Sequence, residues 1–241
     1  MLFFDAHIHL TDFENLKPEN LMADLQKAGV EKCVCVAAKI SDWEKIAKFA
    51  NGFPFEVVPS FGVHPWYALD AKPNFIDELK TYLQKFDNAV IGECGFDGLK
   101  SKNEEMERKV FEAQLECAFE YKRPLMLHMV KADMFLEKYW GRLPEKSVFH
   151  SFSGSIEILK KILKFGHYIS VNERFFKKKN ATEILNYAPT ERLLVETDAP
   201  FQSEISDLKS VAEKIAKIKQ EMPEDLSRKL YLNTLEVFIG D

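Results

Sequence analysis

The chain has 241 residues, of which 46% are hydrophobic and 29% charged, and this balance excludes a low-complexity or disordered chain. Its 33 basic and 38 acidic side chains give a net charge of −5. This excludes a protein that binds duplex nucleic acid through a generally basic surface. Any phosphate-bearing ligand must therefore be attracted locally.

Short segments with strand character alternate along the chain with longer helical ones. Most of the short segments are continuous apolar runs rather than alternating ones, which is typical of parallel strands buried on both faces. The predicted strands are, in chain order, Leu2–His7, Lys32–Ala37, Glu56–Val63, Ala89–Cys94, Pro124–His128, Ser147–His150, Tyr168–Val171 and Leu193–Thr197.

The segments between the strands carry helix start and stop signals. Pro18 stands near the start of the first, and Gly29 follows its end, as is usual for helices. Ser41 is the expected N-cap of the second, and Gly52 comes directly after its end. The predicted helices are Pro18–Ala28, Ser41–Asn51, Asn103–Tyr121, Ser155–Phe165, Asp207–Glu221 and Pro223–Phe238.

This alternation predicts the fold class α/β, as a TIM-like (β/α)8 barrel in one domain that spans residues 1–241. The length agrees, because such a barrel typically needs about 250 residues. A doubly wound parallel sheet is the alternative. That fold usually has a glycine-rich phosphate turn after an early strand, and neither G-x-G-x-x-G nor a Walker sequence occurs here.

The chain shows no sign of export or of a membrane span. Its apolar start is too short for a signal peptide, and no apolar run approaches the length that crosses a bilayer. The four cysteines form no Cys-x-x-Cys pair and lie in apolar contexts, so we expect buried, reduced thiols. We therefore expect a cytoplasmic protein, with a monomer as the default oligomeric state.

Five of the six histidines stand at, or just past, the carboxyl end of a predicted strand. This rim carries the catalytic residues of barrel enzymes, whereas the opposite rim mainly serves stability. The five are His7, His9, His64, His128 and His150. The sixth, His167, begins a strand, and we interpret it as structural.

Acidic residues accompany these histidines. His7 and His9 lie on one face of the first strand, because residues i and i+2 of a strand point the same way. Glu93 lies in an apolar strand, where an unpaired carboxylate is costly to bury, and its two oxygens can bridge two cations. Asp198 closes the eighth strand. The set predicts a metal site. The alternative is that each residue is a polar group whose hydrogen bonds are satisfied by its own neighbours.

Six motifs in this chain resemble those of the TatD-type metal-dependent deoxyribonucleases, within the wider amidohydrolase-like barrels. They occur in the same order and span nearly the whole chain. The motifs are Asp5–Leu10 (DAHIHL), Gly62–Pro65 (GVHP), Gly92–Asp97 (GECGFD), Pro124–His128 (PLMLH), His150–Gly154 (HSFSG) and Glu196–Pro200 (ETDAP). Asn233 and Phe238 are similar to the last helix of the family.

The resemblance implies a hydrolase that cleaves phosphodiester bonds with a water activated by two divalent metal ions. The implied ligands of the first ion are His7, His9, Glu93 and Asp198. The implied ligands of the second ion are Glu93, His128 and His150, with Glu93 as the bridge. His64 would contact the substrate or a bound water, and Asp198 would orient or deprotonate the attacking water. Mg²⁺, Mn²⁺ and Zn²⁺ all suit such nitrogen and oxygen ligands.

The sequence departs from the family in two places. After His128 the family usually continues Ser-Arg-Asp-Ala, whereas residues 129–132 here read Met-Val-Lys-Ala, without the arginine and the acid. After Pro200 the family usually has a longer loop with basic residues, whereas residues 201–206 are short and contain none. Hydrolysis of a small phosphoester, amide or lactone therefore stays open, as does a non-catalytic metal-binding protein.

Two aromatic segments near the predicted rim are candidates for substrate contact. The segment 174–179 (RFFKKK) follows the seventh strand, and aromatics beside lysines suit stacking on bases and binding of phosphates in single-stranded DNA. We favour the alternative, a solvated charge run before the next helix. Trp66 and Tyr67 follow His64, where they either stack on a substrate or pack locally. The predicted partner is single-stranded DNA or another phosphoester.

Overall fold

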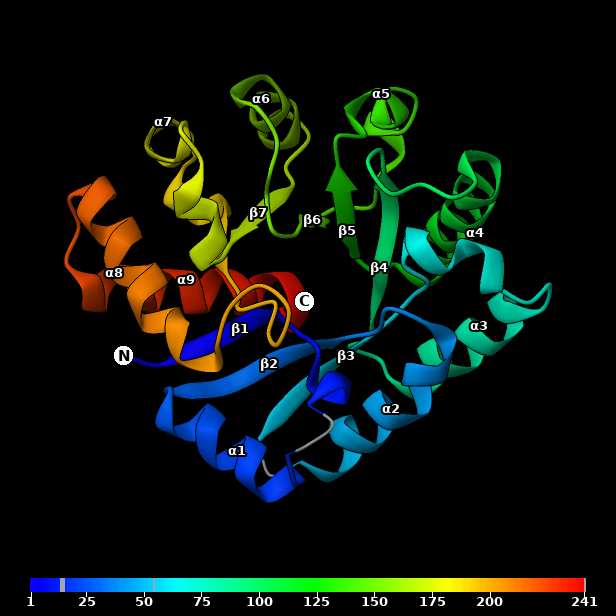
Figure 1. Cartoon of the computed structure of the whole chain (residues 1–241), viewed down its shortest axis with the longest axis horizontal. Coiled ribbons are helices and arrows are strands. Elements are labelled where there is room, and N and C mark those ends of the chain that lie inside the picture. Colours follow the sequence, from blue (N-terminus) through cyan, green and yellow to red (C-terminus); the bar gives the residue numbers. More distant parts are fainter. Residues whose placement is uncertain (14–15, 54, 241) are drawn as a thin grey trace.

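The structure is a computed structural model that describes residues 1–13, 16–53 and 55–240. Its strands form one parallel sheet in the order β1 to β8, and Figure 1 shows this sheet curling into a barrel with helices outside. The strands are β1 (Phe3–Ile8), β2 (Val30–Val36), β3 (Glu56–Phe61), β4 (Val90–Asp97), β5 (Leu125–Val130), β6 (Val148–Phe149), β7 (Tyr168–Val171) and β8 (Leu193–Val195). The predicted TIM-like (β/α)8 barrel is confirmed.

The barrel is closed between its first and last strands by the chain just beyond them. The backbone amide of His9 donates to the carbonyl of Ala199 at 2.9 Å, and the amide of Asp198 donates to the carbonyl of His7 at 2.9 Å. These bonds hold His7 and His9 of one strand beside Asp198 of the other. The closure thus positions three of the predicted ligands.

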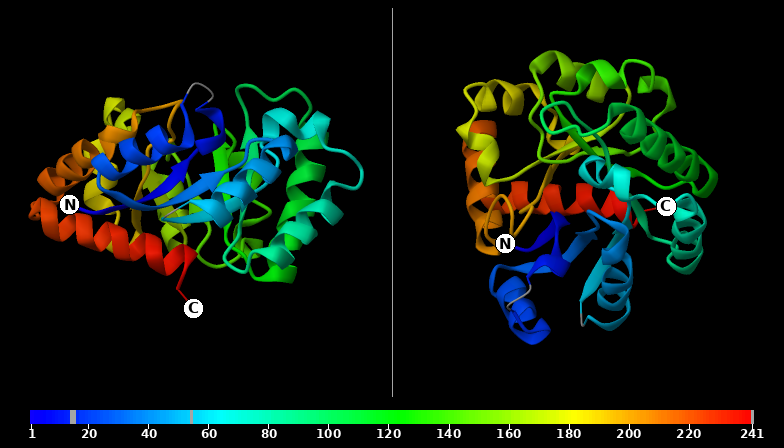
Figure 2. Two further views of the ribbon diagram at one scale, coloured as in Figure 1. Left: turned by 90° about the horizontal axis from the view of Figure 1, so that it is seen from below. Right: turned by 45° about the vertical axis from the view of Figure 1, so that its right-hand side comes forward.

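Helices surround the sheet and alternate with the strands. They are α1 (Pro18–Lys27), α2 (Trp43–Gly52), α3 (Phe75–Lys85), α4 (Glu104–Tyr121), α5 (Asp133–Leu136), α6 (Ile156–Lys164), α7 (Ala181–Tyr187), α8 (Leu208–Lys219) and α9 (Pro223–Phe238). Figure 2 shows α9, in red, lying along the strands near the N-terminus. No helix of the described residues is both long and apolar enough to cross a membrane.

Two hydrophobic clusters fill the fold, one inside the barrel and one between the sheet and the helices. Alternate residues of a strand enter different clusters, because successive side chains point to opposite faces. Phe4 joins the inner cluster, whereas its neighbour Phe3 joins the outer one. Val237 and Phe238, at the end of α9, also belong to the inner cluster. The last helix therefore closes the barrel at the amino ends of its strands, away from the predicted site.

The structure corrects the predicted helices in part. Helices α3, α5 and α7 were not predicted. The predicted N-cap role of Ser41 is wrong, because a short 3-10 turn (Ile40–Asp42) precedes α2 and the Asp42 carboxylate accepts from the amide of Lys39 at 3.1 Å. Gly52 is the last residue of α2 rather than the residue after it. The cysteines are free and buried, as predicted.

Candidate metal centre

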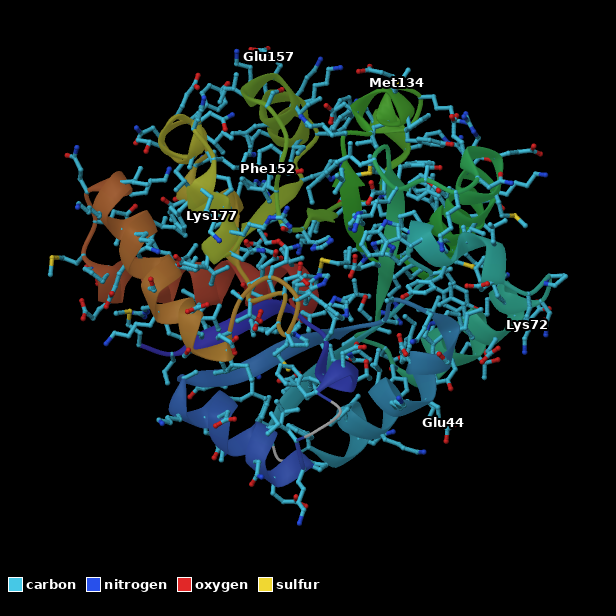
Figure 3. All side chains as sticks on the ribbon, viewed as in Figure 1. Glu44, Lys72, Met134, Phe152, Glu157 and Lys177 are labelled. Atoms are coloured by element: carbon cyan, nitrogen blue, oxygen red, sulfur yellow. The ribbon has the colours of Figure 1, made fainter. Side chains whose placement is uncertain are left out.

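The five histidines of the predicted site meet at one mouth of the barrel, at the carboxyl ends of the strands. His7 lies on β1 and His9 just after it, and the other three come from the ends of three further strands. All five are buried or nearly so. Phe152 and Lys177, labelled in Figure 3, follow β6 and β7 and mark one side of this mouth. Glu93 of β4 lies in the middle of the histidines.

One oxygen of Glu93 faces the first group of predicted ligands. Its Oε1 atom lies 3.2 Å from His7 Nε2 and 3.1 Å from His9 Nε2. The two ring nitrogens are 3.1 Å apart, and Asp198 Oδ1 lies 3.4 Å from His9 Nε2 and 3.9 Å from His7 Nε2. Two imidazole nitrogens and two carboxylate oxygens thus converge on one small volume. Such a set of nitrogen and oxygen donors fits a divalent cation.

The other oxygen of Glu93 faces a second group. Its Oε2 atom lies 3.3 Å from His128 Nδ1 and 3.1 Å from His150 Nε2, and those two nitrogens are 3.3 Å apart. The carboxylate of Glu93 therefore stands between two separate sets of donor atoms. This arrangement suits a carboxylate that bridges two cations.

Neighbouring acceptors orient two of the imidazoles. His9 Nδ1 lies 3.1 Å from the carbonyl oxygen of Val36, which can only accept, so Nδ1 carries the proton and Nε2 keeps its lone pair. His128 Nε2 lies 3.3 Å from Asp97 Oδ2, and the same oxygen accepts from Trp66 Nε1 at 2.8 Å. Burial would raise the pKa of Asp97, but its hydrogen bond from His128 and others lower it. Each bond leaves the other ring nitrogen free to hold a metal.

His64 is bonded differently from the other four histidines. Its Nδ1 atom accepts from the backbone amide of Trp66 at 3.1 Å, so the neutral ring carries its proton on Nε2. That Nε2 lies 3.4 Å from Glu93 Oε2, and burial lowers the pKa of His64 to about 3. Distance alone would group His64 with Glu93 and His128 as ligands. Its protonated Nε2 fits a hydrogen-bond donor better.

The carboxylate of Asp198 is held in place from its outer side. Its Oδ2 atom accepts a hydrogen bond from the side chain of Gln202, which leaves Oδ1 toward His7 and His9. Asp198 has a left-handed backbone with φ of 54°, a conformation that Asp tolerates better than most residues. Next to it, Phe201 is 64% exposed, and its ring centroid lies 5.0 Å from that of His9.

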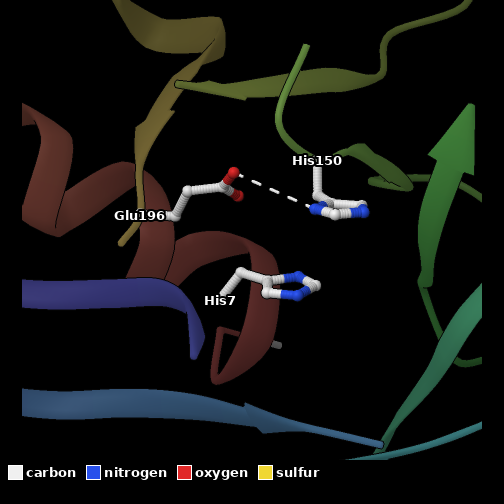
Figure 4. Close-up of side chains that lie close together, drawn as sticks. All are labelled: His7, His150 and Glu196. Carbon is white, nitrogen blue, oxygen red and sulfur yellow. Dashed lines mark ion pairs between the residues drawn. The ribbon is translucent and has the colours of Figure 1, made fainter. Parts of the chain in front are cut away.

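A buried carboxylate that the prediction did not use lies behind His150. Figure 4 shows Glu196 beside the stacked rings of His7 and His150, whose centroids are 4.1 Å apart, with Glu196 Oε1 3.9 Å from His150 Nδ1. The same oxygen accepts from the amide of Ser151 at 2.8 Å and from Asn172 Nδ2 at 3.1 Å. Burial raises the pKa of Glu196 to about 8. With its oxygen already bonded, Glu196 serves as a support of the site.

Asp5 plays a similar supporting role at the seam of the barrel. Its carboxylate accepts from the Thr197 hydroxyl at 2.7 Å, from the Thr197 amide at 3.0 Å and from the His7 amide at 3.1 Å. Burial raises the pKa of Asp5 to about 7. Asp5 thus ties the strand that carries His7 to the segment that carries Asp198. Its place in the first motif did not reveal this cross-strand contact.

The charge of the centre depends on Glu93 and Asp198. Burial would raise the pKa of Glu93, but the imidazoles of His150, His64 and His7 hold it well below its ordinary value. Burial would also lower the pKa of His9, but the carboxylates of Asp198 and Glu93 raise it well above the ordinary value. The centre therefore stabilises positive charge, whether from protons or from a cation.

Trp66 is a packed side chain rather than a free stacking surface. Its ring nitrogen is bonded to Asp97, and Lys100 Nζ lies 4.1 Å from the ring centroid. Tyr67 is half-buried beside it. The sequence is compatible with packing and with stacking at these two positions, and the contacts of Trp66 favour packing.

Buried histidines and carboxylates at the carboxyl rim of a (β/α)8 barrel are typical of metal-dependent hydrolases. The comparisons with known proteins agree with this class. A family model for the TatD related DNases matches residues 4–239, and the chain belongs to that family. The resemblance inferred from the six motifs is therefore confirmed. The alternatives of an amide or lactone hydrolase and of a non-catalytic protein are not favoured.

Relatives and solved structures cover most of the chain. The Deoxyribonuclease Tat-D of Schizosaccharomyces pombe is 30% identical over 226 residues, which cover 83% of this chain and 72% of that protein. The 3'-5' ssDNA/RNA exonuclease TatD of Pantoea ananatis is 28% identical, over 82% of this chain and 79% of its own. The crystal structure of a TatD homologue from Escherichia coli has 22% identity and a TM-score of 0.86, over 98% and 97% of the two chains. This last match supports the fold alone.

Proposed function

We propose that the protein is a two-metal phosphodiesterase whose substrate is single-stranded nucleic acid. The observation that carries the proposal is the position of Glu93, whose two oxygens face two separate sets of donor atoms. Two relatives support the substrate class by their names, one as a deoxyribonuclease and one as an exonuclease of single-stranded DNA and RNA.

Six residues of this chain would hold the two ions. The first ion would be bound by His7, His9, Asp198 and Glu93 Oε1, and the second by His128, His150 and Glu93 Oε2. When bound, such a pair of divalent cations polarises a phosphoryl oxygen and lowers the pKa of water at the site. The donors do not distinguish Mg²⁺, Mn²⁺ and Zn²⁺.

Asp198 is the proposed base. Its Oδ2 is occupied by Gln202, so Oδ1 is the oxygen that faces the reaction site. There it would orient the attacking water and accept its proton. Glu93, the other catalytic residue, would keep the two halves of the site at a fixed separation.

His64 is the proposed substrate contact. Its neutral ring presents the Nε2 proton to the centre, because Nδ1 is engaged by the amide of Trp66. An N–H donor at this place would bind a phosphoryl oxygen of the substrate. Phe201, exposed on the other side of the mouth, would offer its ring to a base.

Turnover of the metal-stripped protein tests the proposal directly. The substrates are a single-stranded DNA oligonucleotide and bis-p-nitrophenyl phosphate, each with and without added Mg²⁺, Mn²⁺ or Zn²⁺, and Glu93→Ala serves as the blank. Metal-dependent cleavage of the oligonucleotide that is absent from the blank is the expected result. Cleavage of neither substrate under any metal condition would overturn the proposal.

We further propose that the chain acts as a cytoplasmic monomer of one domain. All six proposed ligands come from a single chain, and the four cysteines are buried as free thiols, as is usual in a reducing compartment. Light scattering on the metal-loaded protein should give the mass of one 27.9 kDa chain. A stable dimer would contradict the monomer.

A further inference from the structure

A cavity of about 280 Å³ opens beside the candidate metal centre, on the side formed by β5, β6 and β7. His128 and His150, two of the proposed ligands, form one wall. Arg174, Lys177 and Lys178, from the segment after β7, form the opposite wall. Lys177 is labelled in Figure 3. A ligand in this cavity would therefore touch the centre and the basic segment at once.

Within the described part of the chain, the cations of this wall have no carboxylate partner. Among the described residues, no carboxylate forms a salt bridge with Arg174, Lys177 or Lys178, although ion pairs are frequent elsewhere on the surface. Glu173, the nearest acid in sequence, instead pairs with Lys214. Arg174 and Lys177 are exposed. In a chain with a net charge of −5, these three cations gather on one wall of a single cavity beside the centre.

Lys178 is built into the wall rather than free in solvent. Its Nζ atom donates to the carbonyl of Gly154 at 3.1 Å and to that of Phe152 at 3.5 Å, and it lies 5.2 Å from the Phe152 ring centroid. Burial, and to a smaller extent the charge of Lys131, lower the pKa of Lys178 to about 8. A half-buried cation without a carboxylate is costly unless an anion comes close.

Two other segments at the mouth, at the end of β5 and after Pro200, contribute little or no positive charge. Position 130 is Val, and the loop of residues 201–206 contains no basic residue. Lys131, exposed at the end of β5, is close enough to lower the pKa of Lys178 and so adds to the same group. The positive charges on this side of the mouth are therefore Lys131, just after β5, and those of the segment after β7.

We propose that this cavity is an anion subsite that binds a substrate phosphate next to the one being cleaved, with Arg174 and Lys177 as its ligands. The inference rests on the proposed function and deepens it, because it requires a substrate with at least two phosphates. A nucleotide chain meets this requirement and a small phosphomonoester does not. The basic segment then acts in binding, in contrast to the solvated charge run favoured from the sequence.

The first test measures binding without metal or turnover. A fluorescein-labelled single-stranded oligonucleotide is titrated with the metal-stripped protein at several salt concentrations, and fluorescence anisotropy is recorded. The double variant Arg174→Ala/Lys177→Ala should bind about tenfold more weakly, and its log–log salt dependence should be shallower by about 0.7 for each phosphate that it no longer neutralises. Lys179→Ala is the matched control, since Lys179 is exposed on the same segment but does not line the cavity. A double variant that binds like Lys179→Ala would overturn the subsite.

The second test separates this inference from the proposed function. Turnover of bis-p-nitrophenyl phosphate, which has a single phosphate, should stay within about twofold of wild type in the double variant, whereas KM for the oligonucleotide rises about tenfold. An equal loss on both substrates would overturn the subsite, because it would indicate damage to the centre. A wild-type protein that cleaves neither substrate would overturn the proposed function, whatever the binding titration gives.

Discussion

Buried histidines occur at both rims of the barrel, in opposite surroundings. At the carboxyl rim, His7 and His9 stand within 3.2 Å of the Glu93 carboxylate. At the amino rim, His167 is equally buried, yet neither of its ring nitrogens has a hydrogen-bond partner among the described residues. Burial lowers the pKa of His167 to about 4, with a further contribution from Arg192.

The difference shows which feature marks a functional histidine in this fold. Burial is common to both rims, so it does not distinguish them. The carboxylates do, because they can hold cations and they orient the rings, whereas the His167 ring packs near Phe149 and forms no salt bridge with an acid of the described residues. Substitutions at the carboxyl rim should therefore change metal binding and activity, and substitutions at the amino rim should change stability.

Removal of the Glu93 charge, which is proposed to bridge the two ions, should have the largest effect. Glu93→Gln keeps the size of the side chain but weakens both sets of ligands, so bound metal should fall below two ions per chain. Phosphodiester turnover should drop by at least about 10³-fold, since several kcal/mol of transition-state stabilisation are lost. Metal content and kcat are the measurements. Glu107→Gln, at a buried acid of α4, is the control and should leave both unchanged.

The proposed base should affect rate more than metal content. Asp198→Asn retains an oxygen toward His9 but cannot accept a proton, so kcat should fall by about 10²-fold or more while metal is still bound. Elemental analysis beside steady-state kinetics would separate the two effects. Full turnover in this variant would remove Asp198 from the catalytic role.

The orienting carboxylate behind His128 should have a smaller effect. Asp97→Asn weakens the hydrogen bond that directs His128 Nδ1 toward Glu93, and the loss of such partners typically lowers metal affinity by roughly 10- to 100-fold. A competition titration with a chelator would measure it. An unchanged affinity would mean that packing alone orients the ring.

The smallest effect concerns stability at the other rim. Because the pKa of His167 is about 4 in the fold and about 6.5 when unfolded, the unfolded chain binds more protons as the pH falls below about 6.5. Stability is full above that pH and is lost as the pH falls toward about 4. Between about pH 7 and about pH 5.5 the loss should be about 1 kcal/mol.

Urea unfolding at both pH values, in wild type and in His167→Leu, measures this contribution. The variant should lose about 1 kcal/mol less than the wild type over the same interval. Equal losses in both proteins would show that His167 does not carry the acid sensitivity.

The strands could be predicted from the sequence because a buried parallel strand is a continuous apolar run, as in residues 32–37. Helix α3 was missed although Phe75, Leu79 and Leu83 recur at a spacing of four and are buried. Asn74 at the N-cap position and the acids of the first turn also indicate this helix, so its signal is present in the sequence. Helices α5 and α7 are short, with four and seven residues, so their periodicity is weak.

The candidate site was predictable only as far as chain position allows. Histidines at strand ends indicate that the site lies at the carboxyl rim. Glu93 also stands at a strand end, so the sequence places it in the same set of ligands as His150. Gln202 lies only four residues after Asp198, which it supports, but the supporting contacts of Asp97 and Glu196 join elements that are distant along the chain. No spacing rule connects such residues, so the fold is needed to find them.

The proposed position of Glu93 between two cations can be tested by anomalous diffraction from crystals grown with Mn²⁺. We expect two anomalous peaks on either side of the Glu93 carboxylate, one toward His7, His9 and Asp198 and one toward His128 and His150. A single peak, or peaks ligated by other residues, would contradict the bridging role and with it the two-metal site.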